Sequence, residues 1–203
     1  MKEVTSYNTI AQPVESLFKD KGSKFLGFAY PVNNEEDIRV HLEYLKELHP
    51  KATHHCYAWR LGTDDYHYRA NDDGEPSGTA GKPILGQIDA AGLTNCLVVS
   101  VRYFGGTKLG VPGLIAAYKA SARLTLEATE IVTKIIMHSY KIQCGYESLN
   151  KAYQWIQIHQ GIVAGQELTD TCIVYASIPA EHSIRAREAA DQYYPLIIEY
   201  IEA

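Results

Sequence analysis

Residues 97–118 read LVVSVRYFGGTKLGVPGLIAAY and contain three kinds of segment in succession. The run Leu97 to Val101 is apolar on both faces, which is typical of a strand buried inside a sheet. A glycine loop follows, and apolar residues then recur at helical spacing from about Pro112 to Ala128. The stretch therefore predicts a central strand that a glycine-rich loop connects to a long helix.

The segments before this stretch predict a mixed domain of strands and helices. Phe25 to Tyr30 is an apolar and aromatic strand. Asn33 to Leu48 is a predicted helix, since it begins with polar cap residues and with acids that suit the positive end of the helix dipole. His54 to Leu61 and Tyr66 to Arg69 are expected to form a hairpin around the turn Gly62 to Asp65.

A second glycine-rich segment, NDDGEPSGTAGKPIL, occupies residues 71–85 and leads into a helix predicted from Thr79 to Ala91. Ser77 or Thr79 could cap this helix through its hydroxyl. Lys82 lies in the first helical turn, where the dipole favours acids, so it is mild evidence for an anionic partner. A solvated lysine without a partner is the alternative.

The last third of the chain predicts a separate small domain, and the domains are expected at residues 1–132 and 137–203. Strands and helices follow in the order β-α-β-β-α-β, which is the split βαβ, ferredoxin-like plan. The predicted strands are 135–144, 162–168, 172–178 and 196–201, and the predicted helices are 147–160 and 180–194.

The charge of the chain limits where an anionic ligand can bind. The net charge is −5 over 203 residues. Residues 1–136 contain 15 Lys and Arg against 16 Asp and Glu, a net of −1, and residues 137–203 contain 4 against 8, a net of −4. This balance argues against a surface that attracts nucleic acid everywhere, so we expect any anion-binding surface in the first part.

Cysteine usage and the N-terminal sequence predict a cytoplasmic protein with no membrane partner. The four cysteines are widely spaced and include no C-x-x-C pair, so we expect reduced, mostly buried thiols. The N-terminal sequence MKEVTSYNTIAQP lacks the apolar region of a secretory signal. No stretch approaches the roughly 20 apolar residues that a membrane helix needs. The cysteines are Cys56, Cys96, Cys144 and Cys172.

The glycine loop of the opening stretch could bind an anion. In a loop between a strand and a helix, backbone N–H groups and the helix N-terminus can surround a negative group. Arg102 and Lys108 would add positive charge. The spacing fits neither a Walker A loop nor G-x-G-x-x-G. Glycines at such junctions often serve only a tight turn, so spacing alone leaves both interpretations open.

Catalytic and metal-binding patterns are weaker. The surroundings of Ser77 do not match the G-x-S-x-G elbow of a nucleophilic serine. Asp72, Asp73 and Glu75 could bind a hard cation, but they lack EF-hand spacing and are more often solvated turn acids. We expect no catalytic residue, no resident metal and no cofactor.

A group of histidines and aromatic residues precedes the 71–85 segment. His54 and Cys56 share one face of their predicted strand, and His67 on the partner strand could approach them, whereas His55 faces the other way. Three or four ligands at defined spacing would be needed for zinc, so this cluster is a minor hypothesis. The aromatic residues could stack on nucleobases or simply contribute to the core; they are Tyr57, Trp59, Tyr66 and Tyr68.

Four stretches, in order, resemble the signature segments of the IMPACT/YigZ family. They are KGSKFLGFAYPV at 21–32, HHCYAWRLG at 54–62, GEPSGTAGKPIL at 74–85 and VRYFGGTKLGVPGLIAAY at 101–118. The resemblance covers roughly residues 14–125 and implies an α+β protein. Its N-terminal domain would have the fold of the second domain of small-subunit ribosomal protein five. The remainder resembles the ferredoxin-like C-terminal domain of elongation factor G.

The resemblance also implies a role connected with translation. Translation factors and ribosome-associated proteins share this fold, and eukaryotic IMPACT proteins oppose the amino-acid-starvation kinase pathway by competing for its activator. Bacterial members have no established reaction. One departure is that KLGVPGLIAAY stands where members often read GLGGLIRAY. Ala116 or Ala117 then replaces a common arginine, which removes one candidate phosphate contact.

We therefore expect a non-enzymatic regulatory protein that binds RNA or the ribosome where the two glycine-rich loops meet around an anion. A protein–protein adaptor with a translation-related partner and an enzyme acting on a small phosphorylated substrate are the alternatives. The expected anion- or nucleic-acid-binding residues are Lys21, Lys24, Lys82, Arg102, Lys108, Gly78, Gly81, Gly105, Gly106, Ser77 and Thr79.

Overall fold

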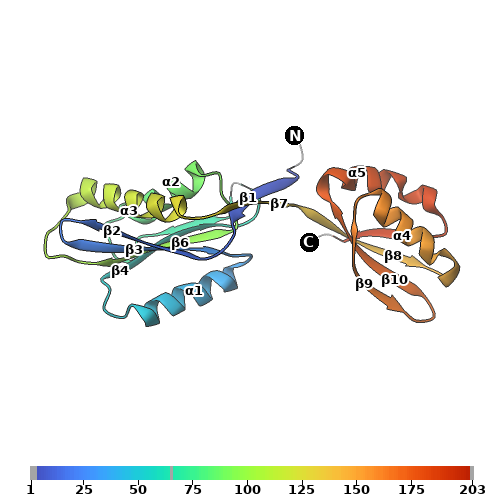
Figure 1. Cartoon of the computed structure of the whole chain (residues 1–203), viewed down its shortest axis with the longest axis horizontal. Coiled ribbons are helices and arrows are strands. Elements are labelled where there is room, and N and C mark those ends of the chain that lie inside the picture. The colour runs from blue at the N-terminus through green and yellow to red at the C-terminus, as the bar shows by residue number, and fades with distance from the viewer. Residues whose placement is uncertain (1–3, 65, 202–203) are drawn as a thin grey trace. The chain divides into compact units, whose positions relative to one another are not determined.

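The structure, a computed structural model, describes residues 4–64 and 66–201 and divides the chain into two compact units (Figure 1). The first unit is Asn8–Thr133, and the second combines the start of the chain, up to Tyr7, with the part from Lys134 onward. Strands β1 (Ser6–Ile10) and β7 (Ile131–Ile135) pair as a two-stranded sheet, and both divisions of the chain fall within these strands. Each unit is described separately below.

The first unit is built on a five-stranded sheet in the order β2-β3-β6-β4-β5. All neighbouring pairs are antiparallel. The central strand β6 is buried along almost its whole length, so the prediction of a buried strand from Leu97 to Val101 is confirmed. The strands are β2 (Val14–Asp20), β3 (Ser23–Pro31), β4 (His54–Arg60), β5 (Tyr68–Asn71) and β6 (Cys96–Tyr103).

Helices cover both faces of this sheet. Helices α2 (Gly81–Ala90) and α3 (Gly110–Glu127) lie on one face, and α1 (Glu35–Leu48) lies on the other (Figure 1). Each face has its own apolar core, one around the inner sides of α2 and α3 and one beneath α1. The predicted start of α1 is confirmed, because the Asn34 side chain accepts a hydrogen bond from the Asp37 backbone N–H at 2.9 Å.

Helix α3 approaches the sheet closely through small and polar residues. A Cβ at Gly27 of β3 would overlap the Thr125 hydroxyl, so only glycine fits beneath this helix. Ser100 of β6 and Ser121 of α3 form a buried hydrogen bond at 2.9 Å. These contacts fix the position of α3 and therefore of the loop that precedes it.

The hairpin of β4 and β5 differs from the sequence-based expectation, and two N-terminal strands were not predicted. Strand β5 starts at Tyr68, two residues later than predicted, because Asp64 Oδ1 accepts hydrogen bonds from the N–H groups of Tyr66 and His67 and holds them in the turn. Asp65, in the predicted turn, lies outside the described residues. Strands β1 and β2 have no assignment in the sequence analysis.

The second unit contains a four-stranded antiparallel sheet in the order β11-β8-β10-β9. Its main elements are β8 (Met137–Cys144), α4 (Leu149–Ile158), β9 (Ile162–Leu168), β10 (Cys172–Pro179), α5 (Ala180–Ala189) and β11 (Ile197–Ile201). Two 3₁₀ turns, Tyr146–Ser148 and Ala190–Tyr193, extend the helices, so α5 itself is shorter than the predicted 180–194. The chain as a whole is a mixed α+β protein.

The four cysteines are all buried and free, which confirms the expectation of buried thiols. Over the described ranges, no helix combines the length and the apolar character that a membrane crossing requires.

Candidate anion-binding site

The two glycine-rich loops line one pocket at an end of the first unit's sheet. The pocket has a volume of about 320 Å³. Glu75 and Pro76 belong to the loop before α2, and Lys108 and Gly110 belong to the loop before α3. Most of the remaining wall is apolar and comprises Phe104, Leu109, Val111 and Leu114.

A buried ion pair in the lining of this pocket connects the loop before α2 to strand β6. Arg102, near the end of β6, donates from Nη1 to Glu75 Oε1 at 2.5 Å, and both side chains are almost fully buried. The Tyr118 hydroxyl of α3 donates to the same carboxylate oxygen at 2.8 Å. The Arg102 guanidinium also lies over two aromatic rings, 5.5 Å from the centre of Phe25 and 5.7 Å from that of Phe104. The loop before α2 is therefore held directly to the central strand.

The nucleophilic groups near this ion pair are kept protonated. Burial raises the pKa of Tyr118, and Cys56 and Glu75 beside it raise that pKa further. Burial likewise raises the pKa of the Cys56 thiol, whose sulfur lies 3.3 Å from the Tyr118 hydroxyl. Because a thiol attacks as the thiolate, Cys56 is unsuited to nucleophilic catalysis in this setting.

His54 adds a polar group to the wall of the pocket. Its Nδ1 lies 2.7 Å from the Asp73 carbonyl oxygen, and because a carbonyl only accepts, Nδ1 carries the proton. Its Nε2 lies 3.8 Å from Glu75 Oε1. Asp73 is also engaged, since its carboxylate accepts from the His55 backbone N–H at 2.6 Å. The carboxylates of Glu75 and Asp73 thus both hold the loop before α2 in place through hydrogen bonds to strands β6 and β4.

The carboxylate of Asp72 caps helix α2. It accepts hydrogen bonds from the backbone N–H groups of Gly78 at 2.8 Å and of Ala80 and Gly81 at 2.9 Å. Burial alone would raise the pKa of Asp72, but these hydrogen bonds outweigh it and the pKa lies below its ordinary value. The expectation that Ser77 or Thr79 caps the helix is wrong, because the N–H groups at the helix start donate to the Asp72 carboxylate and not to either hydroxyl.

Two of the predicted site residues, Thr79 and Lys82, lie near this cap. The Thr79 hydroxyl donates to the Pro76 carbonyl oxygen at 2.6 Å and is buried. Lys82 is exposed, and its charge helps to lower the pKa of Asp72. Lys82, in the first turn of α2, therefore already lies near a negatively charged side chain of the protein, that of Asp72.

The start of helix α3 is different. Among the described residues, no side chain forms a capping hydrogen bond with it, and its first turn contains no acid. Lys108, two residues before the helix, is exposed, and among the described residues it has no ion-pair partner. The partial positive charge of the helix N-terminus and the lysine therefore reinforce each other on one side of the pocket.

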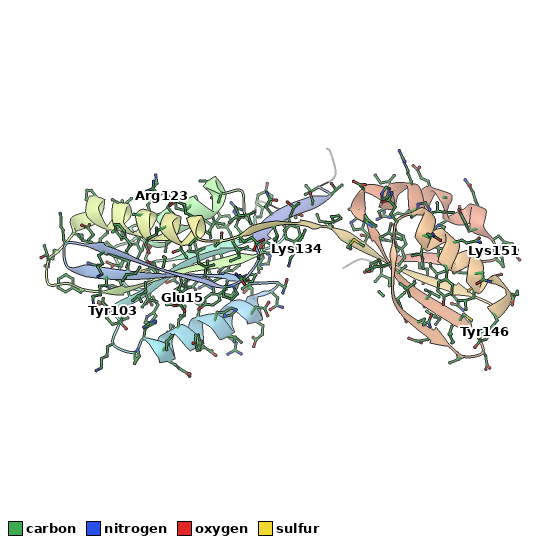
Figure 2. All side chains as sticks on the ribbon, viewed as in Figure 1. Glu15, Tyr103, Arg123, Lys134, Tyr146 and Lys151 are labelled. Carbon is green, nitrogen blue, oxygen red and sulfur yellow. The ribbon has the colours of Figure 1, made fainter. Side chains whose placement is uncertain are left out.

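A second pocket of about 470 Å³ lies beside the first and shares Phe104 with it. Lys24, which pairs with Tyr103 in the β3–β6 register, lines this second pocket. Tyr103, labelled in Figure 2, marks this end of the sheet. Phe104 itself is 48% exposed. A half-exposed aromatic ring thus separates two pockets that each contain a lysine.

The turn between β2 and β3 completes this end of the unit. A Cβ at Gly105 would overlap the backbone of Gly22, so the loop after β6 packs tightly on that turn. The Gly105 N–H also donates to the Ser23 hydroxyl at 3.2 Å. Lys21 in the same turn is exposed and adopts a positive φ of 43°.

The structure separates the eleven predicted site residues into two groups. One group lies at the end of β6, on the loop before α3 and on the β2–β3 turn. The other lies around the Asp72 cap of α2. The first comprises Lys21, Lys24, Arg102, Gly105, Gly106 and Lys108, and the second comprises Ser77, Gly78, Thr79, Gly81 and Lys82.

The sequence analysis missed three residues of the site: Phe104 and Tyr118 altogether, and Glu75 as the partner of Arg102. A signal for the ion pair exists, because a charged residue in an otherwise apolar buried strand needs a partner. Arg102 is such a residue, and it is 5% exposed. Its partner lies 27 positions away, however, and no local pattern identifies it.

The hypothetical metal ligands do not converge. His67 Nε2 lies 3.3 Å from Glu35 Oε1, whereas Cys56 Sγ lies 3.0 Å from the Asp72 carbonyl oxygen. Within the part of the chain that the structure describes, no group of three His, Cys, Asp or Glu side chains is arranged to hold a metal ion.

Comparison with known proteins gives consistent matches. Residues 21–126 match the family described as the Impact N-terminal domain. "IMPACT family member YigZ" of Escherichia coli (strain K12) is 31% identical over 172 residues, which cover 84% of each chain. "IMPACT family member YvyE" of Bacillus subtilis (strain 168) is 36% identical over 146 residues, 72% of this chain and 67% of its own.

A solved structure matches nearly the whole chain. It is described as the crystal structure of an hypothetical protein, and it superposes with a TM-score of 0.76 at 29% identity. The match covers 98% of this chain and 99% of the other, so it includes both units.

Proposed function

The chain belongs to the IMPACT family, and from this premise we propose that it is a non-enzymatic regulatory protein of translation that binds RNA, free or in the ribosome. The proposed binding surface is the end of the first unit formed by Lys21, Lys24, Phe104 and Lys108. It is called the basic end below. The proposed setting is the cytoplasm.

The position of Phe104 carries this proposal. Proteins that bind single-stranded nucleic acid combine positive groups that follow the backbone with aromatic rings on which bases stack. Phe104 is half-exposed between two pockets, one lined by Lys24 and the other by Lys108. A base could stack on the exposed ring while phosphates on either side of it contact the two lysines.

The rest of the unit supports a binding role over an enzymatic one. The loop carboxylates that could act as acids or bases are engaged by the fold: Asp72 caps α2, Asp73 accepts from His55, and Glu75 accepts from Arg102. The residues from 137 onward carry a net charge of −4, so phosphate binding is favoured on the first unit.

We further propose fold assignments for the two units. The first unit would have the fold of the second domain of small-subunit ribosomal protein five. The second would be ferredoxin-like, as in the C-terminal domain of elongation factor G. Support for the second assignment comes from the order of its elements and from the strand order β11-β8-β10-β9.

The test is a titration of the purified protein with labelled transfer RNA and ribosomal RNA at several salt concentrations. We expect salt-sensitive binding that the double variant Lys24→Ala/Lys108→Ala weakens strongly. The matched control is Lys119→Ala/Lys151→Ala, which removes the same charge from exposed positions of α3 and α4. We also expect Phe104→Ala to cost about 1–3 kcal/mol of binding free energy through lost stacking.

Two results would contradict the proposal. One is an absence of RNA binding even at low salt. The other is an equal loss of affinity in the control pair, which would mean that only the overall charge matters.

A further inference from the structure

The pocket between the two glycine-rich loops is better suited to a small molecule than to a nucleic-acid backbone alone. Its volume of about 320 Å³ lies at the lower end of the range typical of ligand pockets. Its exposed walls are mainly apolar, and its polar and charged side chains are Thr53, His54, Glu75, Arg102 and Lys108. Small-molecule sites commonly combine an apolar wall with a few polar groups that orient the ligand.

Arg102 has an unused hydrogen-bond donor at this pocket. Its side chain is 6% exposed, and its Nη1 donates to Glu75. Its Nε, however, is buried and has no hydrogen-bond partner among the described residues. Leaving such a group unpaired costs about 1–3 kcal/mol, and more for a charged group. Because this Nε has almost no accessible surface, an acceptor atom of a ligand in the pocket that Arg102 lines would remove this cost only once the Arg102 side chain shifts to meet it.

The charges around the pocket favour an anion. Arg102 and Glu75 neutralise each other, and Lys108 then remains as a full positive charge at the pocket wall. The uncapped start of α3 adds the partial positive charge of an 18-residue helix, and Gly110 at that start lines the pocket. Lys108 and the helix start therefore both attract negative charge to the pocket, and Arg102 adds an unpaired N–H donor in the same lining.

We propose that this pocket binds a small organic acid, with its carboxylate or phosphate group at Arg102, Lys108 and the start of α3 and its apolar body against Phe104, Leu109 and Leu114. The two acidic groups share the chemistry that the pocket recognises, which is an oxyanion on an apolar body. This goes beyond the proposed RNA binding, because such a ligand needs no nucleic acid.

The experiment uses the full chain and four probes: benzoate, phenyl phosphate, the uncharged benzamide and inorganic phosphate. Binding is measured by calorimetric titration and by shifts of the Gly110 and Val111 amide resonances. We expect one of the two aromatic acids to bind saturably. Benzamide should bind about tenfold more weakly or worse, since it lacks the negative charge that Lys108 and the start of α3 attract. Inorganic phosphate should also bind more weakly, since it lacks the apolar body.

A pocket-filling variant separates specific from nonspecific binding. Val111 lines the pocket but is 51% exposed, so Val111→Trp should fill the pocket without unfolding the protein. The matched control is Leu124→Trp, at an exposed position further along α3. We expect acid binding to weaken at least about tenfold in the first variant and to stay unchanged in the second.

Three results would overturn the inference: neither acid binds, benzamide binds as well as the acids, or Val111→Trp binds the acid as the wild type does. Failure here is distinguishable from failure of the proposed function. RNA binding that persists while all four probes fail would leave the basic end intact as an RNA site. Acid binding without RNA binding would identify the pocket as the functional site.

Discussion

The starts of helices α2 and α3 differ in how their positive ends are satisfied. Both follow glycine-rich loops on the same face of one sheet, and both lie near a lysine (Figure 1). At α2 the Asp72 carboxylate accepts three backbone hydrogen bonds, and Lys82 lies close enough to lower its pKa. At α3 no side chain in the described part of the chain caps the helix, and Lys108 is exposed beside a pocket.

The difference shows which of two similar loops is available to a ligand. A glycine-rich loop with a lysine predicts an anion in both cases. At α2 the anion is part of the protein, so that loop is a structural element. At α3 the same chemistry remains available to a molecule from outside. The predictions below test this contrast, from the largest expected effect to the smallest.

The largest effect is expected at the ion pair of Glu75 and Arg102, which connects the loop before α2 to strand β6. Removing one partner of a buried pair costs about 3–5 kcal/mol, because the other charge remains buried without compensation. Arg102→Ala and Glu75→Ala should each reduce the free energy of unfolding by this amount, as measured by urea denaturation. The double variant Glu75→Leu/Arg102→Met should be much less destabilised than either single variant. Equal destabilisation in all three would show that the pair does not act as a unit.

The second effect concerns the cap of α2. Asp72→Ala removes the partner of three backbone N–H groups, and we expect it to lower the free energy of unfolding by about 2–3 kcal/mol. Asp72→Asn should cost less, because the amide oxygen still accepts hydrogen bonds. Thermal or urea denaturation of the two variants provides the measurement, and an unchanged stability in Asp72→Ala would contradict the assignment of the cap.

The Asp72 cap also predicts a pH dependence. Its folded-state pKa lies below the ordinary value, so its contribution to stability is fully present above the unfolded pKa of about 3.9. The contribution is lost as the pH falls through the folded-state pKa. The difference in unfolding free energy between wild type and Asp72→Asn should therefore shrink at acid pH. A difference that grows on acidification would have the wrong sign for a depressed pKa.

The third effect concerns the loop before α3. A methyl group at Gly105 would overlap the backbone of Gly22, so Gly105→Ala should cost about 1–3 kcal/mol of stability and displace the loop. Gly106 is the matched control, because its Cβ position is open and only its φ of 86° opposes substitution. Gly106→Ala should cost about 1 kcal/mol. Thermal denaturation of both variants checks the order, and a larger loss in Gly106→Ala would contradict the close packing at Gly105.

Local sequence patterns predicted much of the fold. The apolar run from Leu97 identified the central strand, and Asn34 with the acids after it identified the start of α1, because both signals act within a few residues. Strand β2 lacked a comparable signal, since its residues alternate only between partial burial and exposure at a sheet edge.

The site was less predictable because its key contacts join distant parts of the chain. Glu75, Arg102 and Tyr118 meet through the packing of α3 on the sheet, and no spacing rule relates them. Asp72 was identified as a turn acid, yet its role as a cap depends on how the loop folds back over several residues. Both loops combine glycines with a lysine, and this shared composition does not show which of them is free to bind a ligand.

The smallest expected effect tests the central contrast most directly, through the salt dependence of RNA affinity in Lys108→Ala and Lys82→Ala. We predict that Lys108→Ala reduces the slope of log K against log salt by about 0.7, the value for one phosphate contact on a single strand. Lys82→Ala should change it much less, because Lys82 already lies beside Asp72. A wild-type slope in Lys108→Ala, or an equal reduction in Lys82→Ala, would contradict the account.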